Sequence, residues 1–203
     1  MKKNKTSKNW LTKQHRDIYV KKSKIDGYRS RSAYKLIEIE NKFNIFKNTK
    51  TFLDLGSYPG GWTQVAKEKI RSGKILSVDL KKMQLIDGTD FILGDFLIPE
   101  TKLKIINFFK NRVDIIVSDM ATNTTGNKTL DVINTGELCL QAMEFSKDLF
   151  KKDCVFVSKI FMGSNFNEII KYAKKIFKIV KIYKPESSRK ESKENYIVCR
   201  NLN

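Results

Sequence analysis

The strongest constraint on how this chain folds is a repeated alternation of short apolar runs with segments of helical periodicity. The run at 51–55 (Thr-Phe-Leu-Asp-Leu) has the pattern of a buried strand, and apolar residues recur at helical spacing after the glycine-rich turn at 56–61. Strands that alternate with helices are typical of a mostly parallel sheet covered by helices on both faces. We therefore expect a doubly wound α/β fold. Further strands are expected at 74–79, 91–95, 113–119, 154–159, 178–183 and 195–199.

The end of the chain departs from this alternation. The polar loop at 184–194 is too short for a helical crossover, so the last two strands should form an antiparallel pair that adds one antiparallel edge strand. No linker divides the 203 residues, of which 40% are hydrophobic. We expect a basic N-terminal arm at 1–27 followed by a single domain at 28–203. Helical patterns begin near 30, 62, 103, 138 and 166, and the segment 121–131 is expected to be a surface loop.

The formal net charge of +18 points to a polyanionic partner, because 40 basic residues face only 22 acidic ones. Nucleic acid is the commonest partner of this kind, and a lysine-rich surface that reflects biased base composition is the alternative. The three cysteines, Cys139, Cys154 and Cys199, are far apart and lack CxxC spacing. They favour neither a disulfide framework nor a zinc site, and they suit a reducing compartment such as the cytoplasm or an organelle with ribosomes. No apolar run reaches the roughly 18 residues of a membrane span.

The glycine-rich turn is a candidate cofactor site. Its spacing, Gly56 followed by Gly60 and Gly61, is neither the GxGxxG of pyrophosphate binding nor a phosphate-binding P-loop. A cofactor without phosphate is therefore favoured, and S-adenosylmethionine (SAM) is such a molecule. Asp79 ends the second strand, where a carboxylate can accept the ribose hydroxyls. Asp95 follows the third strand and is a candidate acceptor for the adenine amino group.

Four charged residues are expected to meet at the same edge of the sheet. Asp119 and Lys159 end the fourth and fifth strands, Lys35 lies in the first turn of an early helix, and Glu194 precedes the last strand. A single lysine is usually a solvated surface charge, but Lys159 follows an apolar run and must be paired or functional. This set suits proton transfer or the stabilisation of an oxyanion. No metal site is expected.

The chain also resembles a known family. The resemblance is carried by Trp10-Leu-Thr, Tyr28-Arg-Ser-Arg-Ser-Ala-Tyr-Lys-Leu, Asp54-Leu-Gly with Pro59-Gly-Gly-Trp62, Gly94-Asp-Phe, Ser118-Asp-Met-Ala, Ser158-Lys-Ile-Phe, and Lys184-Pro-Glu-Ser-Ser-Arg with Glu194-Asn-Tyr-Ile-Val. These blocks, in order over about 9–200, are similar to the FtsJ (RrmJ) family of RNA ribose 2′-O-methyltransferases. The resemblance implies a Rossmann-like SAM-dependent methyltransferase fold, with S-adenosylhomocysteine (SAH) as the product.

The resemblance further implies roles for individual residues. It implies a catalytic tetrad of Lys35, Asp119, Lys159 and Glu194. The expected cofactor contacts are Gly56, Gly60, Gly61, Trp62, Asp79, Asp95 and Asp119. Two positions depart from the family: Tyr58 stands where a small residue is usual, and Thr122 replaces a proline. The first alters the methionine end of the pocket, and the second removes a residue that would stiffen the loop beside the substrate.

The implied substrate is RNA, with a uridine of large-subunit ribosomal RNA as the first hypothesis. A tRNA anticodon loop and an mRNA cap ribose are alternatives, as is a non-catalytic RNA-binding assembly factor on the same fold. A dehydrogenase is weakened by the missing GxGxxG. We expect a monomer that acts on neither DNA nor membranes. The residues expected to contact RNA are Lys8, Lys13, Arg29, Arg31 and Arg189.

Lys159 has two candidate roles that the sequence leaves open. A general base requires a neutral amine, which burial and the like charge of Lys35 favour and the two acids oppose. A charged Lys159 would instead stabilise the developing oxyanion.

Overall fold

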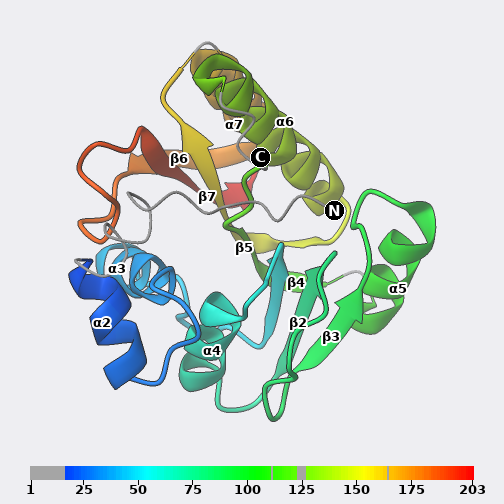
Figure 1. Ribbon diagram of the computed structural model, residues 1–203. Helices are drawn as coiled ribbons and strands as arrows, with labels where there is room; N and C mark the ends of the chain where they lie inside the picture. Colours follow the sequence, from blue (N-terminus) through cyan, green and yellow to red (C-terminus); the bar gives the residue numbers. More distant parts are fainter. Residues whose placement is uncertain (1–16, 111, 123–126, 164) are drawn as a thin grey trace, which may run out of the picture.

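A computed structural model describes residues 17–110, 112–122, 127–163 and 165–203 of the chain. Its centre is a seven-stranded sheet in the order β3-β2-β1-β4-β5-β7-β6 (Figure 1). All pairs from β3 to β5 are parallel, whereas β7 runs antiparallel to both β5 and β6. The strands are β1 (Thr51–Leu55), β2 (Lys74–Asp79), β3 (Asp90–Leu93), β4 (Val113–Ser118), β5 (Phe150–Phe161), β6 (Phe177–Tyr183) and β7 (Glu194–Leu202).

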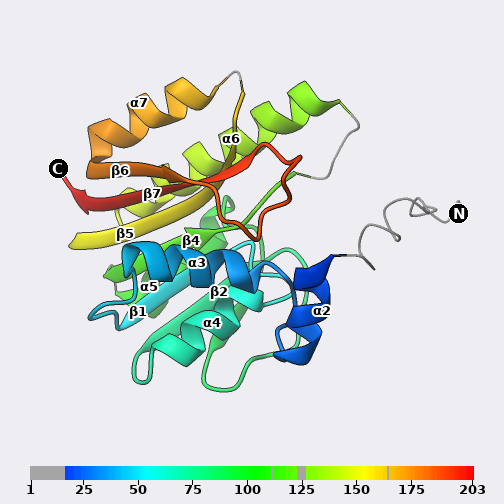
Figure 2. The same cartoon turned by 90° about the vertical axis from the view of Figure 1, so that its left-hand side faces the viewer.

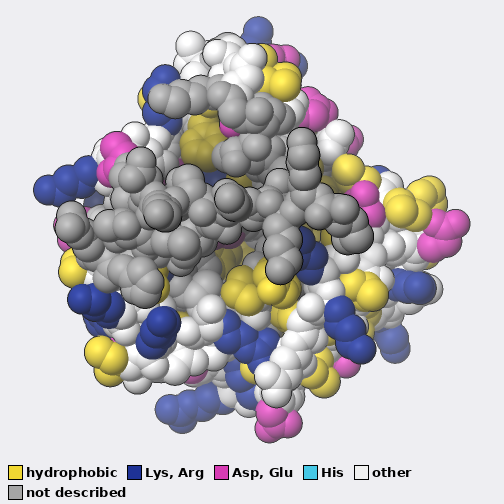
Figure 3. Space-filling model, in the orientation of Figure 1, with side chains coloured by type: hydrophobic (Ala, Val, Ile, Leu, Met, Phe, Trp, Pro, Cys, Tyr) yellow, Lys and Arg dark blue, Asp and Glu magenta, His cyan; other side chains and the backbone are white. Residues whose placement is uncertain are grey.

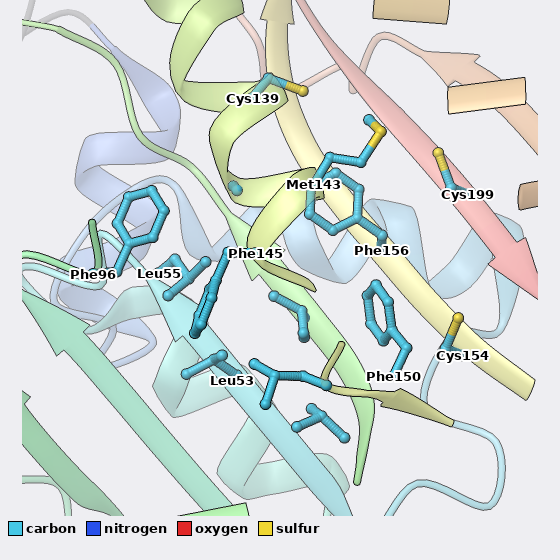
Figure 4. Packing of buried hydrophobic residues seen from close by; sticks show 14 of the residues in the cluster. Leu53, Leu55, Phe96, Cys139, Met143, Phe145, Phe150, Cys154, Phe156 and Cys199 are labelled. Carbon is cyan, nitrogen blue, oxygen red and sulfur yellow. The ribbon is translucent and has the colours of Figure 1, made fainter. Parts of the chain in front are cut away.

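Helices cover both faces of the sheet (Figure 2). The described helices are α2 (Ile18–Ile25), α3 (Ala33–Phe43), α4 (Gly61–Lys69), α5 (Pro99–Phe109), α6 (Lys128–Lys147) and α7 (Phe166–Ile176). One hydrophobic cluster joins α3 and α4 to the first face, and a second joins α5, α6 and α7 to the other. Figure 4 shows the second cluster, in which the rings of Phe145, Phe150 and Phe156 fill the space between sheet and helices. The predicted α/β, Rossmann-like class is confirmed.

The last two strands form the predicted antiparallel pair at one edge of the sheet, but the strand that runs antiparallel to the others, β7, is not the outermost one. β6 forms the edge, and the chain turns back so that β7 is inserted between β5 and β6. Burial explains this order. The run 196–199 of β7 is entirely buried, whereas four of the seven β6 residues are exposed. A continuous apolar run suits an interior strand, and the lysines of β6 suit an edge.

Two helices begin earlier than the sequence pattern suggested. The segment 121–131 is not a loop throughout, because α6 begins at Lys128 and Asn127 caps it by accepting from the amides of Thr129 and Leu130. α5 begins at Pro99 rather than near 103, with proline at a first-turn position that requires no donor. Within the predicted arm at 1–27, residues 18–25 form α2. Residues 1–16 and 123–126 lie outside the described part of the chain.

None of the helices in the described part of the chain is both long enough and apolar enough to cross a bilayer.

Candidate active site

The four charged residues singled out in the sequence come together at the carboxyl edge of the sheet. Lys35 lies in the first turn of α3, Asp119 follows β4, Lys159 lies on β5, and Glu194 begins β7. Lys35 Nζ lies 2.9 Å from Glu194 Oε1 and 3.6 Å from Asp119 Oδ2. Lys159 Nζ lies 2.8 Å from Asp119 Oδ1 and 3.5 Å from Glu194 Oε2. Each lysine therefore touches both acids, and the four side chains form a closed ring, here called the tetrad.

Burial makes this mutual pairing necessary. Lys35, Lys159 and Glu194 are all buried, and an unpaired charge in such a place would be strongly destabilising. The register between β5 and β7 creates the arrangement. Lys159 lies opposite Tyr196, and Glu194, two residues before Tyr196, lies opposite Phe161. The order of the strands, with β5 between β4 and β7, brings Asp119 and Glu194 to opposite sides of Lys159.

Two further residues hold the acids in place and escaped the sequence analysis. The Tyr196 hydroxyl donates to Asp119 Oδ1 at 2.5 Å, and the Ser188 hydroxyl donates to Glu194 Oε1 at 2.8 Å. Tyr196 lies two residues after Glu194 on the same strand, so both side chains point to the same face. That spacing was the available signal for Tyr196. Ser188 comes from an irregular loop, and nothing in its sequence context indicated the contact.

The charges of the tetrad shift the pKa values of Asp119, Glu194 and Lys159 in the directions that keep these three residues charged. Burial, the largest influence, would raise the pKa of Asp119, but the charges of Lys159 and Lys35 reverse this and lower it. The pKa of Glu194 is lowered for the same reasons, with Lys35 as the larger attraction. Burial would lower the pKa of Lys159, yet Asp119 and Glu194 outweigh burial and raise it. Lys159 is therefore an ammonium at neutral pH in the protein alone.

A cavity of about 580 Å³ opens beside the tetrad. It lies at the carboxyl ends of β1, β2, β3 and β4. The order of the strands reverses at β1, and ligands bind at such a switch point in open α/β sheets. Asp119 lines this cavity and also belongs to the tetrad. The lining residues that were predicted as cofactor contacts are Gly56, Asp79, Asp95 and Asp119; Tyr58, Lys81, Phe96, Met120, Thr122 and Leu138 were not predicted as contacts.

The predicted glycines and tryptophan play different parts in the structure. Gly56 has a φ of 74°, and an added Cβ would stand 2.0 Å from Met120 Cγ, so only glycine fits at the cavity wall. Gly60, Gly61 and Trp62 do not line the cavity. Trp62 is only 2% exposed; its indole Nε1 donates to the Ser32 carbonyl at 2.8 Å and its ring lies 5.6 Å from that of Tyr196. Its contact with a cofactor stays a prediction.

The two aspartates of the cavity differ in how they are held. Asp79 accepts from the backbone amide of Tyr58 through Oδ2 and from that of Lys81 through Oδ1, each at 2.8 Å. The Asp95 carboxylate accepts from the Leu97 amide, at 2.9 Å through Oδ1. Asp79 therefore fixes the two turns that flank it, and both carboxylates still face the cavity as acceptors.

The predicted RNA contacts are only partly open. Arg29 donates to the carbonyls of Pro59, Gln84 and Leu85 at 3.3, 2.5 and 3.3 Å. Arg31 pairs with Asp17 and donates to the Ser187 carbonyl. Their guanidinium groups thus join loops of the protein, while the Arg189 side chain, 3.5 Å from Asp17, is 36% exposed. Lys8 and Lys13 lie outside the described residues.

Among the described residues, no group of three or more His, Cys, Asp or Glu side chains is placed to hold a metal ion. A second cavity, of about 670 Å³, is lined by Thr49, Asp114, Phe150 and their neighbours near the opposite ends of the strands, and no member of the tetrad lines it.

Comparisons with known proteins give a consistent result. The FtsJ-like methyltransferase family matches residues 28–202. A ribosomal RNA large subunit methyltransferase E from Pelagibacter ubique is 57% identical over 202 residues, which cover 100% of both chains. The protein of the same name from Rickettsia conorii is 45% identical and covers 97% of this chain and 89% of its own.

The solved structures agree with the sequence relatives. A crystal structure described as a ribosomal RNA methyltransferase from Plasmodium falciparum is 35% identical, has a TM-score of 0.78, and covers 86% of this chain and 98% of its own. Human methyltransferase-like protein 13, solved with SAH, is 12% identical with a TM-score of 0.56, covers 83% of this chain and 79% of its own, and shares the fold alone.

Proposed function

Because the chain belongs to the FtsJ-like methyltransferase family, we propose that it transfers the methyl group of SAM to the 2′-hydroxyl of a ribose in large-subunit ribosomal RNA. The main support for this proposal is that Asp119 belongs both to the cavity and to the tetrad. Its side chain lines the cavity and contacts both lysines of the tetrad. A methyl donor in the cavity and a hydroxyl held by the tetrad would therefore meet at one residue. The names of the relatives support ribosomal RNA as the substrate.

The chemistry of the cavity fits SAM. Its volume of about 580 Å³ lies within the range of small-molecule sites. Asp79 offers carboxylate oxygens to the ribose hydroxyls and Asp95 to the adenine amino group, while the absence of a side chain at Gly56 lets Met120 pack closely at the cavity wall. The acids that line the cavity also suit the cationic sulfonium, and no bound phosphate needs neutralising.

The tetrad is proposed to orient the ribose and to remove the proton of its 2′-hydroxyl. In the reaction the ribose oxygen forms a bond to the methyl carbon, the carbon–sulfur bond breaks with its electrons going to sulfur, and the hydroxyl proton is released. Holding the oxygen in line with the methyl can supply about 7–11 kcal/mol. Lys35 and Glu194, which pair at 2.9 Å, are placed to fix the ribose beside Lys159.

Lys159 is proposed as the general base of the loaded enzyme. In the protein alone its pKa is raised by Asp119 and Glu194, so the amine must lose a proton before it can act. A positive cofactor bound next to Asp119 competes for that carboxylate and lowers the pKa of Lys159. We expect the rate to rise with pH along a single deprotonation, and we expect Lys159→Arg to be inactive. An Arg variant that keeps activity would instead indicate that a permanent cation stabilises the oxyanion.

The proposal is tested by methyl transfer from isotopically labelled SAM. Large-subunit ribosomal RNA, intact large subunits and tRNA are offered in parallel, and a methylated ribose is located by its resistance to alkaline hydrolysis. We expect label on one ribose of the ribosomal RNA and a loss of about 10³-fold or more in Asp119→Asn and Lys159→Met. Lys147→Met is the matched control, since its exposed ion pair with Glu144 lies outside the site. Label on a base, on tRNA alone or on no RNA would contradict the proposal.

A further inference from the structure

Tyr58 stands at the cavity in an unusual setting for a large aromatic side chain. It is 50% exposed although it lines the cavity. Among the described residues it belongs to neither hydrophobic cluster, and no other aromatic ring lies against it. The ammonium of Lys81 lies over its ring, with Nζ 5.4 Å from the ring centroid. An aromatic side chain that is half exposed at a cavity is available to a ligand.

Asp79 fixes the positions of both residues. Its two carboxylate oxygens accept, one each, from the backbone amides of Tyr58 and Lys81. The turn after β1 and the turn after β2 are thereby held on either side of one carboxylate. The Tyr58 ring and the Lys81 ammonium consequently stand together at the cavity next to Asp79. A cation–π contact at an exposed position is weak, so a ligand can displace or rearrange the pair at little cost.

We propose that Tyr58, held by Lys81, forms a movable wall of the cofactor cavity that covers the adenosyl part of the bound cofactor and slows its release. Its position beside Asp79 favours the adenosyl part over the methionine end, which the family resemblance suggested. The inference rests on the proposed function, because it requires an adenosyl ligand held at Asp79. The wall contributes by removing apolar surface of the ring and of the ligand from water. This apolar surface is buried only after the ligand has entered the cavity. The wall therefore lowers the dissociation rate more than it changes the association rate. Tyr58 is thus a residue that sets cofactor affinity and takes no part in methyl transfer.

Calorimetry and stopped-flow measurements with SAH test the wall directly. Tyr58→Ala removes the ring but keeps the backbone amide that donates to Asp79. We expect it to raise the Kd for SAH about tenfold, mainly through faster dissociation. Tyr58→Phe should stay within about twofold of the unmodified protein, since the ring and not the hydroxyl forms the wall. Lys81→Met, which keeps an unbranched side chain without the charge, should cost about two- to threefold.

The control is Leu103→Ala, which trims a comparably exposed apolar side chain (58%) on α5, outside the cavity. It should leave SAH binding unchanged. Methylation assays add a separate readout: Tyr58→Ala should raise the KM for SAM while kcat at saturation is kept. Unchanged or tighter SAH binding by Tyr58→Ala, in a protein that binds and uses the cofactor normally, would overturn the wall alone. Failure of the unmodified protein to bind SAH would overturn both the wall and the proposed function.

Discussion

Asp54 and Asp119 are aspartates of adjacent strands at the same edge of the sheet, yet their surroundings set opposite protonation preferences. Asp119 meets two lysines, which hold its pKa below the usual value despite burial. No cation of the described residues influences the pKa of Asp54 in this way. Burial raises its pKa to about 7, the hydrogen bond from the Thr63 hydroxyl at 2.7 Å opposes this, and the charges of Asp119 and Asp79 add to the rise. Asp54, which lies just before the glycine-rich turn, therefore gains or loses its proton close to neutral pH.

This difference predicts how stability changes with pH. In the unfolded chain Asp54 titrates near pH 4, whereas in the folded protein it holds its proton until about pH 7. Between these values the folded state binds the extra proton, so the free energy of unfolding decreases as pH rises through the window. Asp54→Asn removes the titration. We expect the stability of the variant relative to the unmodified protein to rise by on the order of 3 kcal/mol from pH 4 to pH 8.

Urea unfolding of both proteins at several pH values measures the effect. Asp87→Asn, at an exposed loop position, serves as the control and should follow the unmodified protein at every pH. If the free energies of unfolding of Asp54→Asn and the unmodified protein changed in parallel with pH, Asp54 would ionise normally in the folded state.

At the scale of elements, apolar periodicity predicted the strands and their alternation with helices, because each buried run is locally recognisable. The order of the last two strands was not predictable in the same way. An apolar run such as 196–199 shows that a strand is buried, but its neighbours depend on how the chain turns back at 184–193. The tetrad could be predicted because its residues lie at the ends of strands or in the first turn of a helix, whereas Ser188 reaches Glu194 from an irregular loop. Arg31 shows a different limit of the sequence. Its charge suggested a contact with RNA, but in the structure it forms an ion pair with Asp17.

Asp17 helps to hold α2 to the domain, together with the contacts of Tyr19 and Lys22 with the Tyr34 ring. Its carboxylate caps the helix by accepting from the amides of Tyr19 and Val20, and it pairs with Arg31 and Arg189. Arg31 in turn donates to the carbonyl of Ser187, next to the residue that supports Glu194. One side chain therefore links α2, the start of α3 and the loop between β6 and β7.

Replacing Asp17 should consequently loosen α2 first. We expect Asp17→Ala to lower the free energy of unfolding by about 2 kcal/mol or more, because the helix loses its cap and the largely buried Arg31 loses its carboxylate partner. Limited proteolysis should become faster within α2, at Lys21, Lys22 and Lys24. Asp87→Ala is the matched control and should change neither measurement. If Asp17→Ala left both the unfolding curve and the cleavage rate unchanged, α2 would be held by its other contacts.

At the scale of the whole molecule, the excess of positive charge is separate from the chemistry. The tetrad contains two cations and two anions, and the cavity presents three aspartates, so neither accounts for the net charge of +18. Lys and Arg side chains are instead spread over the surface, as the face in Figure 3 shows. A spread of this kind suits a large polyanion that contacts the protein at many points. The cofactor and the RNA are therefore expected to respond differently to ionic strength.

That difference can be measured on one protein. If about four to five phosphates are neutralised, the logarithm of the RNA association constant should fall with the logarithm of salt at a slope of about −3 to −4. Affinity would then drop about a hundredfold between 50 and 200 mM salt. SAH, a zwitterion without phosphate, should bind with nearly the same affinity over this range, since it releases no condensed counterions. A flat response of RNA binding would mean that base or shape contacts dominate and that the basic surface is merely solvated. An equally steep response of SAH would point to salt acting on the protein itself.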